Sequence, residues 1–394
     1  MLVSKFFKSF LPFNMRRQVR ELFIATTMVN FALAMVMIFE PIYLYQTGHS
    51  LHKIMLFYLM AYVLYFLIMP FGAKFARKKG YEKGMFVGTF FFIIFYLSLF
   101  LIFYYPLLFY ISPIILAVHK MFYWPAYHAD FAHFCKDTEE GREVTAVTIT
   151  SSLVYIIGPA LAGFIIFEWG YNTLFILTSI IFLASNIPTL VTTEKFKPTD
   201  FPYKETYRNL FSKKNRKEFL AYLGFGEEFI VVMVWPIFIS LIITSVFDLG
   251  MIIALATLIT TMLTFYIGHL SDTSDKRKIL RLGSAFYSLG WFIRIFIANR
   301  VGVFFVDTLS RLSRNTVAIP LMAITYEKAK EITNTGNHKY VMSRVVFFEM
   351  SLVIGKILAM LLIFLISSLV VDEIMAFKLI FVLAGGMSLL YLLL

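Results

Sequence analysis

Residues 54–79 read IMLFYLMAYVLYFLIMPFGAKFARKK, an uncharged apolar run that is followed at once by a basic cluster. The run from residue 54 to residue 72 is long enough for an α-helix to cross the hydrocarbon core of a bilayer, which takes about 20 residues. Strands of a membrane β-barrel are shorter and alternate apolar with polar positions, and this run does neither. The stretch therefore predicts a transmembrane helix with a basic connection at one end.

The composition of the whole chain agrees with such helices. Of its 394 residues 59% are hydrophobic and 15% are charged, whereas an ordinary soluble domain carries roughly 25% charged residues. A soluble protein of this composition would expose large apolar patches, so a soluble enzyme, a disordered chain and a nucleic-acid module are excluded. The single cysteine, Cys135, excludes a disulfide framework and a multi-cysteine metal site, and we expect no metal and no cofactor.

Further apolar runs of similar length follow one another along the chain. We predict an all-α integral membrane protein with about twelve transmembrane helices. The predicted spans cover residues 21–45, 54–72, 84–105, 106–127, 144–167, 173–191, 219–243, 250–270, 282–298, 301–326, 341–369 and 374–394.

The positions of the basic residues predict the orientation. With the N-terminus placed in the cytoplasm, 27 of the 36 lysines and arginines fall in inner segments, and only Lys53 and Arg300 fall in outer loops. This is a strong positive-inside bias, so we predict a multi-pass protein of the plasma or inner membrane with both termini cytoplasmic. The net charge of +12 is then an attraction to the inner leaflet, and no nucleic-acid partner is expected. Residues 1–18 are read as an amphipathic segment on that leaflet, without a removable signal peptide.

The chain divides into two halves. Residues 192–218 form the longest polar stretch and are interpreted as a cytoplasmic linker between six-helix halves at 21–191 and 219–394, after an N-terminal segment at 1–20. Gly72 and Gly268 each follow the second span of a half and stand 196 residues apart, which is close to half the chain length. Two six-helix halves related in this way are typical of transporters.

At this repeated loop the chain resembles the major facilitator superfamily, in its bacterial type. The family has a motif rich in glycine, aspartate and arginine after the second helix of each half. The second-half copy is matched by Gly268, Leu270, Asp272 and Arg277, whereas the first-half copy keeps Gly72 and Arg77 but has Ala76 where the family has aspartate. The resemblance implies that these residues form a cytoplasmic gate and that spans one, four, seven and ten line a central cavity. Asp130 lies at the inner end of span four, and from this position we expect it to make a contact at the same gate.

A second partial motif lies in the fifth span. Gly158, Pro159 and Gly163 are similar to a signature of antiporters in that superfamily, although Ala162 departs from it. Small residues at these positions also let helices pack closely, and this structural explanation is sufficient. We therefore assign these residues to helix packing and leave open whether the solute moves inward or outward.

Two adjacent glutamates lie inside the seventh span. Glu227 lies about 12 Å from the predicted inner end, at 1.5 Å per residue, and Glu228 follows it. Removal from water disfavours a charged carboxyl, so one of them is expected to carry a proton; a structural pair with a basic residue is the alternative. Trp235 lies further along the same span.

The fourth span combines basic and aromatic residues. Lys120 lies at nearly the depth of Glu227, so an ion pair between Lys120 and Glu227 or Glu228 is plausible. His119 is either a titrating relay or a hydrogen-bonded histidine in a helix interface. Tyr123 and Trp124 complete the candidate face.

The tenth span places Asp307, Arg311 and Arg314 on one face, at i, i+4 and i+7. Asp307 and Arg311 can form an ion pair within the helix, which leaves Arg314 for a partner on another helix. These charges either form a buried network between the halves or contact the substrate, and both alternatives stay open. Asn30 in the first span either touches substrate or bonds a neighbouring helix.

Charged residues also occur in other spans. Glu349 and Lys356 in span eleven are read as a structural pair, Arg294 in span nine as an arginine that reaches the interface, and Glu40 as an outer-rim gate.

Three functions remain open. The first is a secondary transporter of a small amphipathic or zwitterionic solute, monomeric, proton-coupled and not an enzyme, with export by antiport as one mode. The second is a membrane-embedded enzyme such as an acyltransferase that uses His119 or His128. The third is a sensor derived from a transporter. The chain has no Gly-x-x-x-x-Gly-Lys-Ser/Thr loop, so direct use of ATP is not expected.

Overall fold

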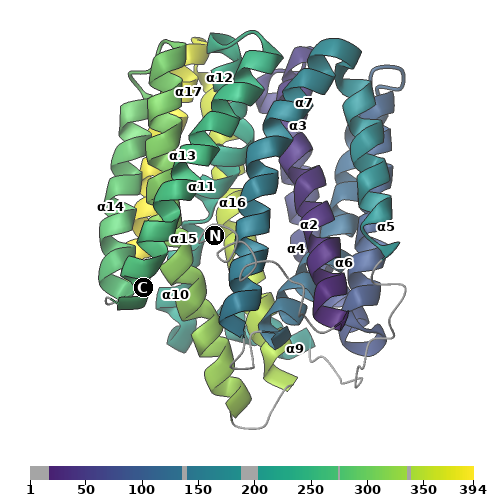
Figure 1. Cartoon of the computed structure of the whole chain (residues 1–394), viewed down its shortest axis with the longest axis vertical. Coiled ribbons are helices and arrows are strands. Elements are labelled where there is room, and N and C mark those ends of the chain that lie inside the picture. The colour runs from purple at the N-terminus through teal and green to yellow at the C-terminus, as the bar shows by residue number, and fades with distance from the viewer. Residues whose placement is uncertain (1–16, 135–139, 188–202, 274–275, 335–338) are drawn as a thin grey trace, which may run out of the picture.

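The computed structural model describes residues 17–134, 140–187, 203–273, 276–334 and 339–394. In these residues the chain is helical throughout, without a strand, as predicted. Residues 1–16 of the N-terminal segment and residues 192–202 of the linker lie outside the described residues. The first half and the second half lie side by side as two groups of upright helices (Figure 1).

The first half holds every predicted span from one to six in a helix. Span one is divided into α2 and α3 by a turn at residues 37–38, and spans five and six form a single element, α7, that is broken at Gly170. Gly170 has φ 80° and ψ 172°, a conformation that glycine adopts without a steric penalty. The elements are α2 (Arg17–Val36), α3 (Phe39–Gln46), α4 (Leu51–Lys79), α5 (Tyr81–Leu101), α6 (Leu108–Phe134) and α7 (Glu140–Ala184).

The second half begins with the described end of the linker, which is the short helix α9 (Tyr203–Leu210) and the 3-10 turn η1 (Lys213–Asn215). Its membrane helices carry the remaining predicted spans. They are α10 (Arg216–Leu223), α11 (Gly226–Phe229), η2 (Ile230–Val234), α12 (Trp235–Ile242), α13 (Val246–Thr273), α14 (Lys276–Arg294), α15 (Arg300–Asn334), α16 (Lys339–Leu369), α17 (Glu373–Ser388) and η3 (Leu389–Leu393).

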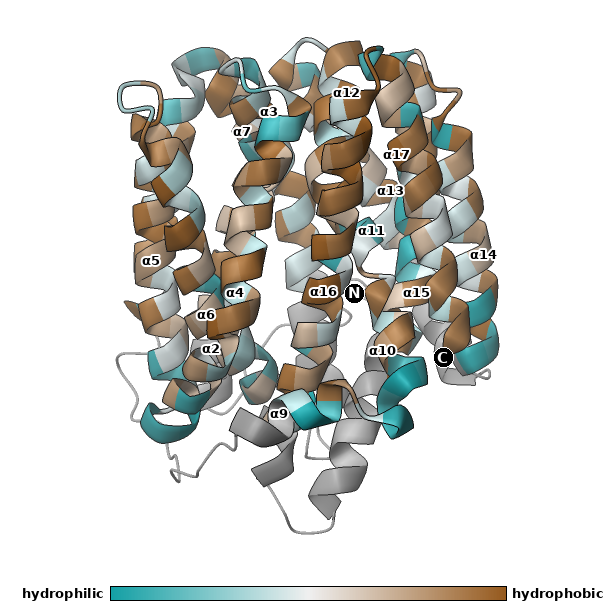
Figure 2. Ribbon diagram, turned by 180° about the vertical axis from the view of Figure 1, so that it is seen from behind, coloured by the Kyte–Doolittle hydropathy of each residue, from teal (hydrophilic) through white to brown (hydrophobic). Residues whose placement is uncertain are grey.

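The outside of the bundle is apolar, as a membrane protein requires. Phe71, Phe90, Phe167 and Phe296 are all more than half exposed. Brown, hydrophobic residues cover the middle of the ribbon, and teal, hydrophilic residues gather toward its ends and on the inner helices (Figure 2). Eight helices of the described residues are long and apolar enough to cross a membrane. The predicted spans in α6, α14 and α15 do not meet that measure; each of these helices carries an internal charge.

Among the described residues, the main contacts between the halves are α4 with α16, α7 with α13, α6 with α16, and α3 with α12. The second pair crosses at two glycines. A Cβ on Gly250 of α13 would lie 2.4 Å from the Pro159 carbonyl oxygen, and one on Gly163 of α7 would lie 2.7 Å from the Val246 carbonyl oxygen. The two backbones therefore touch, because neither position carries a side chain.

Span seven is interrupted, although the sequence predicts one continuous helix over residues 219–243. The backbone first makes two hydrogen bonds of the 3-10 type, from Gly224 N to Ala221 O and from Glu227 N to Gly224 O. It then forms the π-helical turn η2. Trp235 and Pro236 begin the next helix, and proline has no N–H to continue the bonding. Interrupted helices and π-turns recur at functional sites in membrane proteins, and here they enclose Glu227 and Glu228.

Candidate functional site

Glu228 lies at the centre of an ion-pair cluster. Its Oε1 is 2.5 Å from Nη2 of Arg314 on α15, and its Oε2 is 2.7 Å from Nζ of Lys356 on α16. The side chains of Glu228 and Arg314 are 28% and 33% exposed, so the cluster is open to solvent although it lies deep in the bundle. One glutamate thus holds together three helices of the second half.

Glu227, the preceding residue, has the opposite environment. It is 2% exposed, and its carboxylate accepts hydrogen bonds from two tyrosine hydroxyls, Tyr287 at 2.6 Å and Tyr391 at 3.0 Å. Among the described residues it makes no ion pair. The two glutamates point to different sides of α11, because successive residues of a helix are about 100° apart.

Lys120 does not pair with either glutamate. Its Nζ lies over the ring of Tyr62, 4.8 Å from the centroid, and 5.9 Å from the ring of Trp124. Lys356 reaches the same Tyr62 ring at 5.9 Å. The lysine of the first half and the cluster of the second half are therefore joined through Tyr62 of α4 and not through a direct ion pair. Cation–π contacts of this kind stabilise a lysine that has left water.

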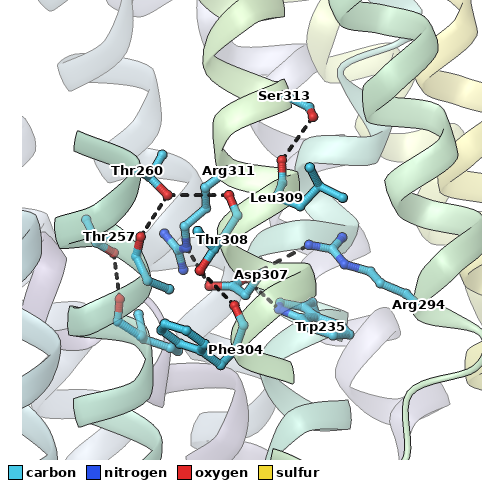
Figure 3. A network of polar contacts seen from close by, with 12 residues as sticks. Trp235, Thr257, Thr260, Arg294, Phe304, Asp307, Thr308, Leu309, Arg311 and Ser313 are labelled. Atoms are coloured by element: carbon cyan, nitrogen blue, oxygen red, sulfur yellow. Dashed lines mark hydrogen bonds and ion pairs between the residues drawn. The ribbon is translucent and has the colours of Figure 1, made fainter. Parts of the chain in front are cut away.

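Asp307 organises a second charged network inside the second half (Figure 3). Its Oδ2 is 2.5 Å from Nε of Arg311, and its Oδ1 accepts a hydrogen bond of 3.0 Å from Nε1 of Trp235. Nη2 of Arg294 lies 4.0 Å from Oδ1. Figure 3 shows the side chains of Arg311, Trp235 and Arg294 all directed at this one carboxylate.

Arg294 does not reach the membrane interface, contrary to the interpretation from sequence. It is 1% exposed, and its guanidinium lies between the rings of Trp291 at 3.9 Å and Trp235 at 4.2 Å. Its position near the outer end of span nine suggested a side chain that reaches the interface, whereas two indole rings and the carboxylate of Asp307 hold it inside.

Glu349 and Lys356 do not form the pair that their spacing suggests. Lys356 pairs with Glu228, whereas Glu349 contacts the first half. Oε1 of Glu349 is 2.9 Å from Nε2 of His128 on α6, and its Oε2 accepts a hydrogen bond of 3.0 Å from the hydroxyl of Tyr65 on α4. The helix α16 therefore lies between the halves and contributes charges to both.

The other polar residues of the predicted face lie in helix contacts. His119 is buried, its Nδ1 is 2.9 Å from the Gly88 carbonyl oxygen, and its ring stacks on Phe92 at 3.9 Å. Tyr123 is buried and stacks on His119 at 5.4 Å. Nδ2 of Asn30 donates a hydrogen bond of 3.1 Å to the hydroxyl of Ser151 on α7. For His119 and Asn30 the geometry is that of the helix-interface alternative.

The gate motif is described only in part. A Cβ on Gly72 would lie 1.9 Å from the Met121 carbonyl oxygen, so α4 and α6 touch at this residue. Arg77 is buried and its Nη1 is 3.3 Å from the Tyr81 hydroxyl, and Asp130 is also buried. Arg277 is exposed. Gly268, Leu270 and Asp272 lie in α13, and their side chains lie outside the described residues, so their role stays a prediction.

The glycine-proline segment of α7 contacts two helices. A Cβ on Gly158 would lie 2.7 Å from Cβ of Ala34 on α2, while Pro159 and Gly163 face Gly250 of α13. The segment therefore packs α7 against its own half on one side and against the other half on the other side.

Sequence reasoning missed the tyrosines that hold Glu227. Tyr287 and Tyr391 lie 60 and 164 residues away from it along the chain, and an isolated tyrosine in an apolar span carries no signal of its own. It also missed the interruption of span seven, for which Gly224, Gly226 and Pro236 were available as breakers.

Comparison with known proteins decides the family. The model of the Major Facilitator Superfamily matches residues 22–331. The chain belongs to this superfamily. Its structure is similar to that of the nucleoside transporter NupG (D323A mutant), with a TM-score of 0.72 and 11% sequence identity, over 95% of this chain and 98% of that one. This likeness confirms the fold alone. No curated protein matches the sequence. The chain is thus a membrane transporter of small solutes.

Proposed function

We propose that the chain is a proton-coupled secondary transporter in which Glu227 carries the proton and Glu228 responds to the solute. The observation that carries this proposal is the opposite environment of two adjacent glutamates. Glu227 is buried among tyrosine hydroxyls, and Glu228 is partly exposed and paired with Arg314 and Lys356. Coupling needs one group that binds a proton and another that binds the solute, close enough to affect each other.

Glu227 suits the proton. A buried carboxylate that makes no ion pair is costly in a membrane, and a proton removes its charge without breaking an ion pair. Hydroxyl groups can donate to the ionised form and accept from the protonated form, so Tyr287 and Tyr391 can hold both. The two states then differ little in shape, which lets the proton come and go during a cycle.

Glu228 suits the solute. Three partly exposed cations, Arg311, Arg314 and Lys356, lie on α15 and α16, and two of them share Glu228. A solute with a carboxylate or phosphate competes with Glu228 for Arg314 and Lys356, and arginine binds both groups with two parallel hydrogen bonds. A cationic group of the same solute would meet the released Glu228, which fits a zwitterion. NupG is a nucleoside transporter, but at 11% sequence identity the similarity concerns the fold and gives no substrate for this chain.

The proposal predicts different losses for two single variants. In proteoliposomes loaded at one pH and diluted into another, Glu227→Gln is expected to abolish accumulation driven by the pH gradient and to keep solute exchange. Glu228→Gln is expected to weaken exchange itself at least tenfold, because the ion pairs that orient Arg314 and Lys356 are lost. Uptake is measured with both directions of the gradient, which also assigns import or export.

Glu373→Gln is the control, since Glu373 is exposed at the other end of the bundle. Accumulation that follows the pH gradient unchanged in Glu227→Gln would contradict the proposal, as would wild-type exchange in Glu228→Gln.

The orientation is proposed from the basic residues, with both termini in the cytoplasm of a plasma or inner membrane. A cysteine at Lys204, in helix α9, is expected to stay unlabelled when an impermeant thiol reagent is added to intact cells and to react after the membrane is opened. Cys135→Ser provides the background without other thiols. Labelling from outside intact cells would reverse the orientation.

A further inference from the structure

A second buried glutamate lies in the first half. Glu40 is on α3, just after the turn that interrupts span one, and is 5% exposed. Its Oε1 accepts a hydrogen bond of 2.7 Å from the hydroxyl of Tyr58 on α4, and its Oε2 accepts 2.9 Å from the hydroxyl of Tyr96 on α5. Both carboxylate oxygens are therefore held by neutral donors. The sequence places Glu40 at the outer rim as a gate; the structure shows that its side chain is buried there, and the gate role stays a prediction.

The arrangement repeats that of Glu227. Each glutamate lies in the first span of its half, shortly after an interruption of the helix, and accepts hydrogen bonds from two tyrosine hydroxyls. Tyr96 and Tyr287 both come from the third span of their half. The two clusters lie at different depths, because Glu40 is near the end of its span and Glu227 near the start.

No cation forms an ion pair with Glu40 among the described residues. Lys120 on α6 acts on it electrostatically, but the Lys120 amino group lies over the ring of Tyr62 and makes no ion pair with Glu40. The helix α12, which packs on α3, has no titratable side chain. Among the described residues, the titratable groups that contact Glu40 are the two tyrosines Tyr58 and Tyr96. Burying a carboxylate without an ion pair inside the membrane carries a large free-energy cost, whereas burying the neutral carboxylic acid does not.

We propose that Glu40 is a second proton-binding carboxyl, one that the first half contributes. The reaction is the addition of one proton to the carboxylate, and the O–H of the resulting acid donates to a tyrosine oxygen that is now free to accept. The site binds a proton whatever the solute is; its part in coupling rests on the function proposed above.

A contact between the halves reaches this site through Tyr58. The ring of Tyr58 meets the ring of Phe229 edge to face at 5.6 Å, and Phe229 directly follows Glu228 on α11 of the second half. The hydroxyl of the same tyrosine holds Glu40. A rotation of one half against the other that moves Phe229 therefore moves a hydrogen-bond donor of Glu40, which changes its affinity for the proton. The proton affinity of Glu40 is then sensitive to the relative position of the two halves.

The test reads the protonated carboxyl directly and does not use transport. The purified chain is studied at neutral pH by infrared absorption, where the C=O stretch of a carboxylic acid is separate from that of a carboxylate and shifts in D₂O. We expect Glu40→Gln to remove one such band from the wild-type spectrum. The matched control is Glu373→Gln, because Glu373 also accepts a hydrogen bond from a tyrosine hydroxyl, 2.8 Å from that of Tyr45, but is exposed.

An unchanged acid band in Glu40→Gln would overturn the proposal. If this variant does not fold, Tyr96→Phe is measured instead: losing one hydrogen bond must shift the band of a protonated Glu40, and no shift would count against the site. The function proposed above fails separately, when Glu227→Gln keeps accumulation driven by the pH gradient, and that result leaves the band of Glu40 as it was.

Discussion

Replacing Asp307 with asparagine is expected to lower the free energy of unfolding by about 3–5 kcal/mol, the usual cost of leaving a buried ion pair with one partner. The asparagine amide keeps the shape of the carboxylate and can still accept from the indole of Trp235. The charge between Arg311 and Arg294 is lost, however, and Arg294 is 1% exposed, with no route to water. The measurement is thermal unfolding of the purified protein in detergent.

The control for this variant is Arg311→Gln. The side chain of Arg311 is one-third exposed, and its removal leaves Asp307 with Arg294 and Trp235, so a clearly smaller loss is expected. If Asp307→Asn unfolds at the wild-type temperature, the network in Figure 3 does not hold the second half together.

Gly250→Ala is the second variant with a large expected effect. The new Cβ would lie 2.4 Å from the carbonyl oxygen of Pro159, which is backbone and cannot turn away. The helices α7 and α13 must separate, and overpacking of this kind costs about 1–3 kcal/mol. Because the crossing joins the two halves, we also expect the rate of solute exchange to fall.

Gly386→Ala is the matched control, since a Cβ there would meet nothing within 4 Å and the residue lies inside the helix α17. Alanine is favoured over glycine within a helix by about 0.5–1 kcal/mol, so this variant is expected to be as stable as wild type or more so. Equal stability of Gly250→Ala and Gly386→Ala would show that the crossing tolerates a side chain.

Much of the fold could be predicted from the sequence because the bilayer imposes a simple rule. A span needs an apolar run of fixed length, and the described part of each predicted run is helical, although spans one and seven are interrupted and spans five and six form one element. The family followed from one loop motif and its position at half the chain length. The second-half copy of the motif lies in a part of α13 whose side chains are not described, so the family model over residues 22–331, and not the geometry of the gate, establishes the assignment.

The partners of the charges could not be predicted in the same way. Spacing along one helix suggests pairs such as Asp307 with Arg311, and this pair forms. It equally suggests Glu349 with Lys356, which instead bind partners on α6 and α11. Which helix faces which is a property of the packed bundle, and periodicity on a single helix does not contain it.

The same limit applies to the adjacent glutamates. The sequence predicts that one of Glu227 and Glu228 faces the site, but the rotation of a short, interrupted helix decides which one. Gly226 and Gly355 fix that rotation: a Cβ on Gly226 would lie 2.5 Å from the Gly355 carbonyl oxygen, so α11 and α16 meet there without side chains. This contact places Lys356 at Glu228 and leaves Glu227 to the tyrosines of α14 and η3.

Proton movement measured together with solute movement tests the central claim most directly. In weakly buffered proteoliposomes containing a pH-sensitive dye, a solute gradient imposed on the wild-type protein should drive a change of internal pH. Glu227→Gln should move the solute down its gradient with no change of internal pH. A pH change of wild-type size in Glu227→Gln, at the same rate of solute movement, would contradict the assignment of the proton to this residue.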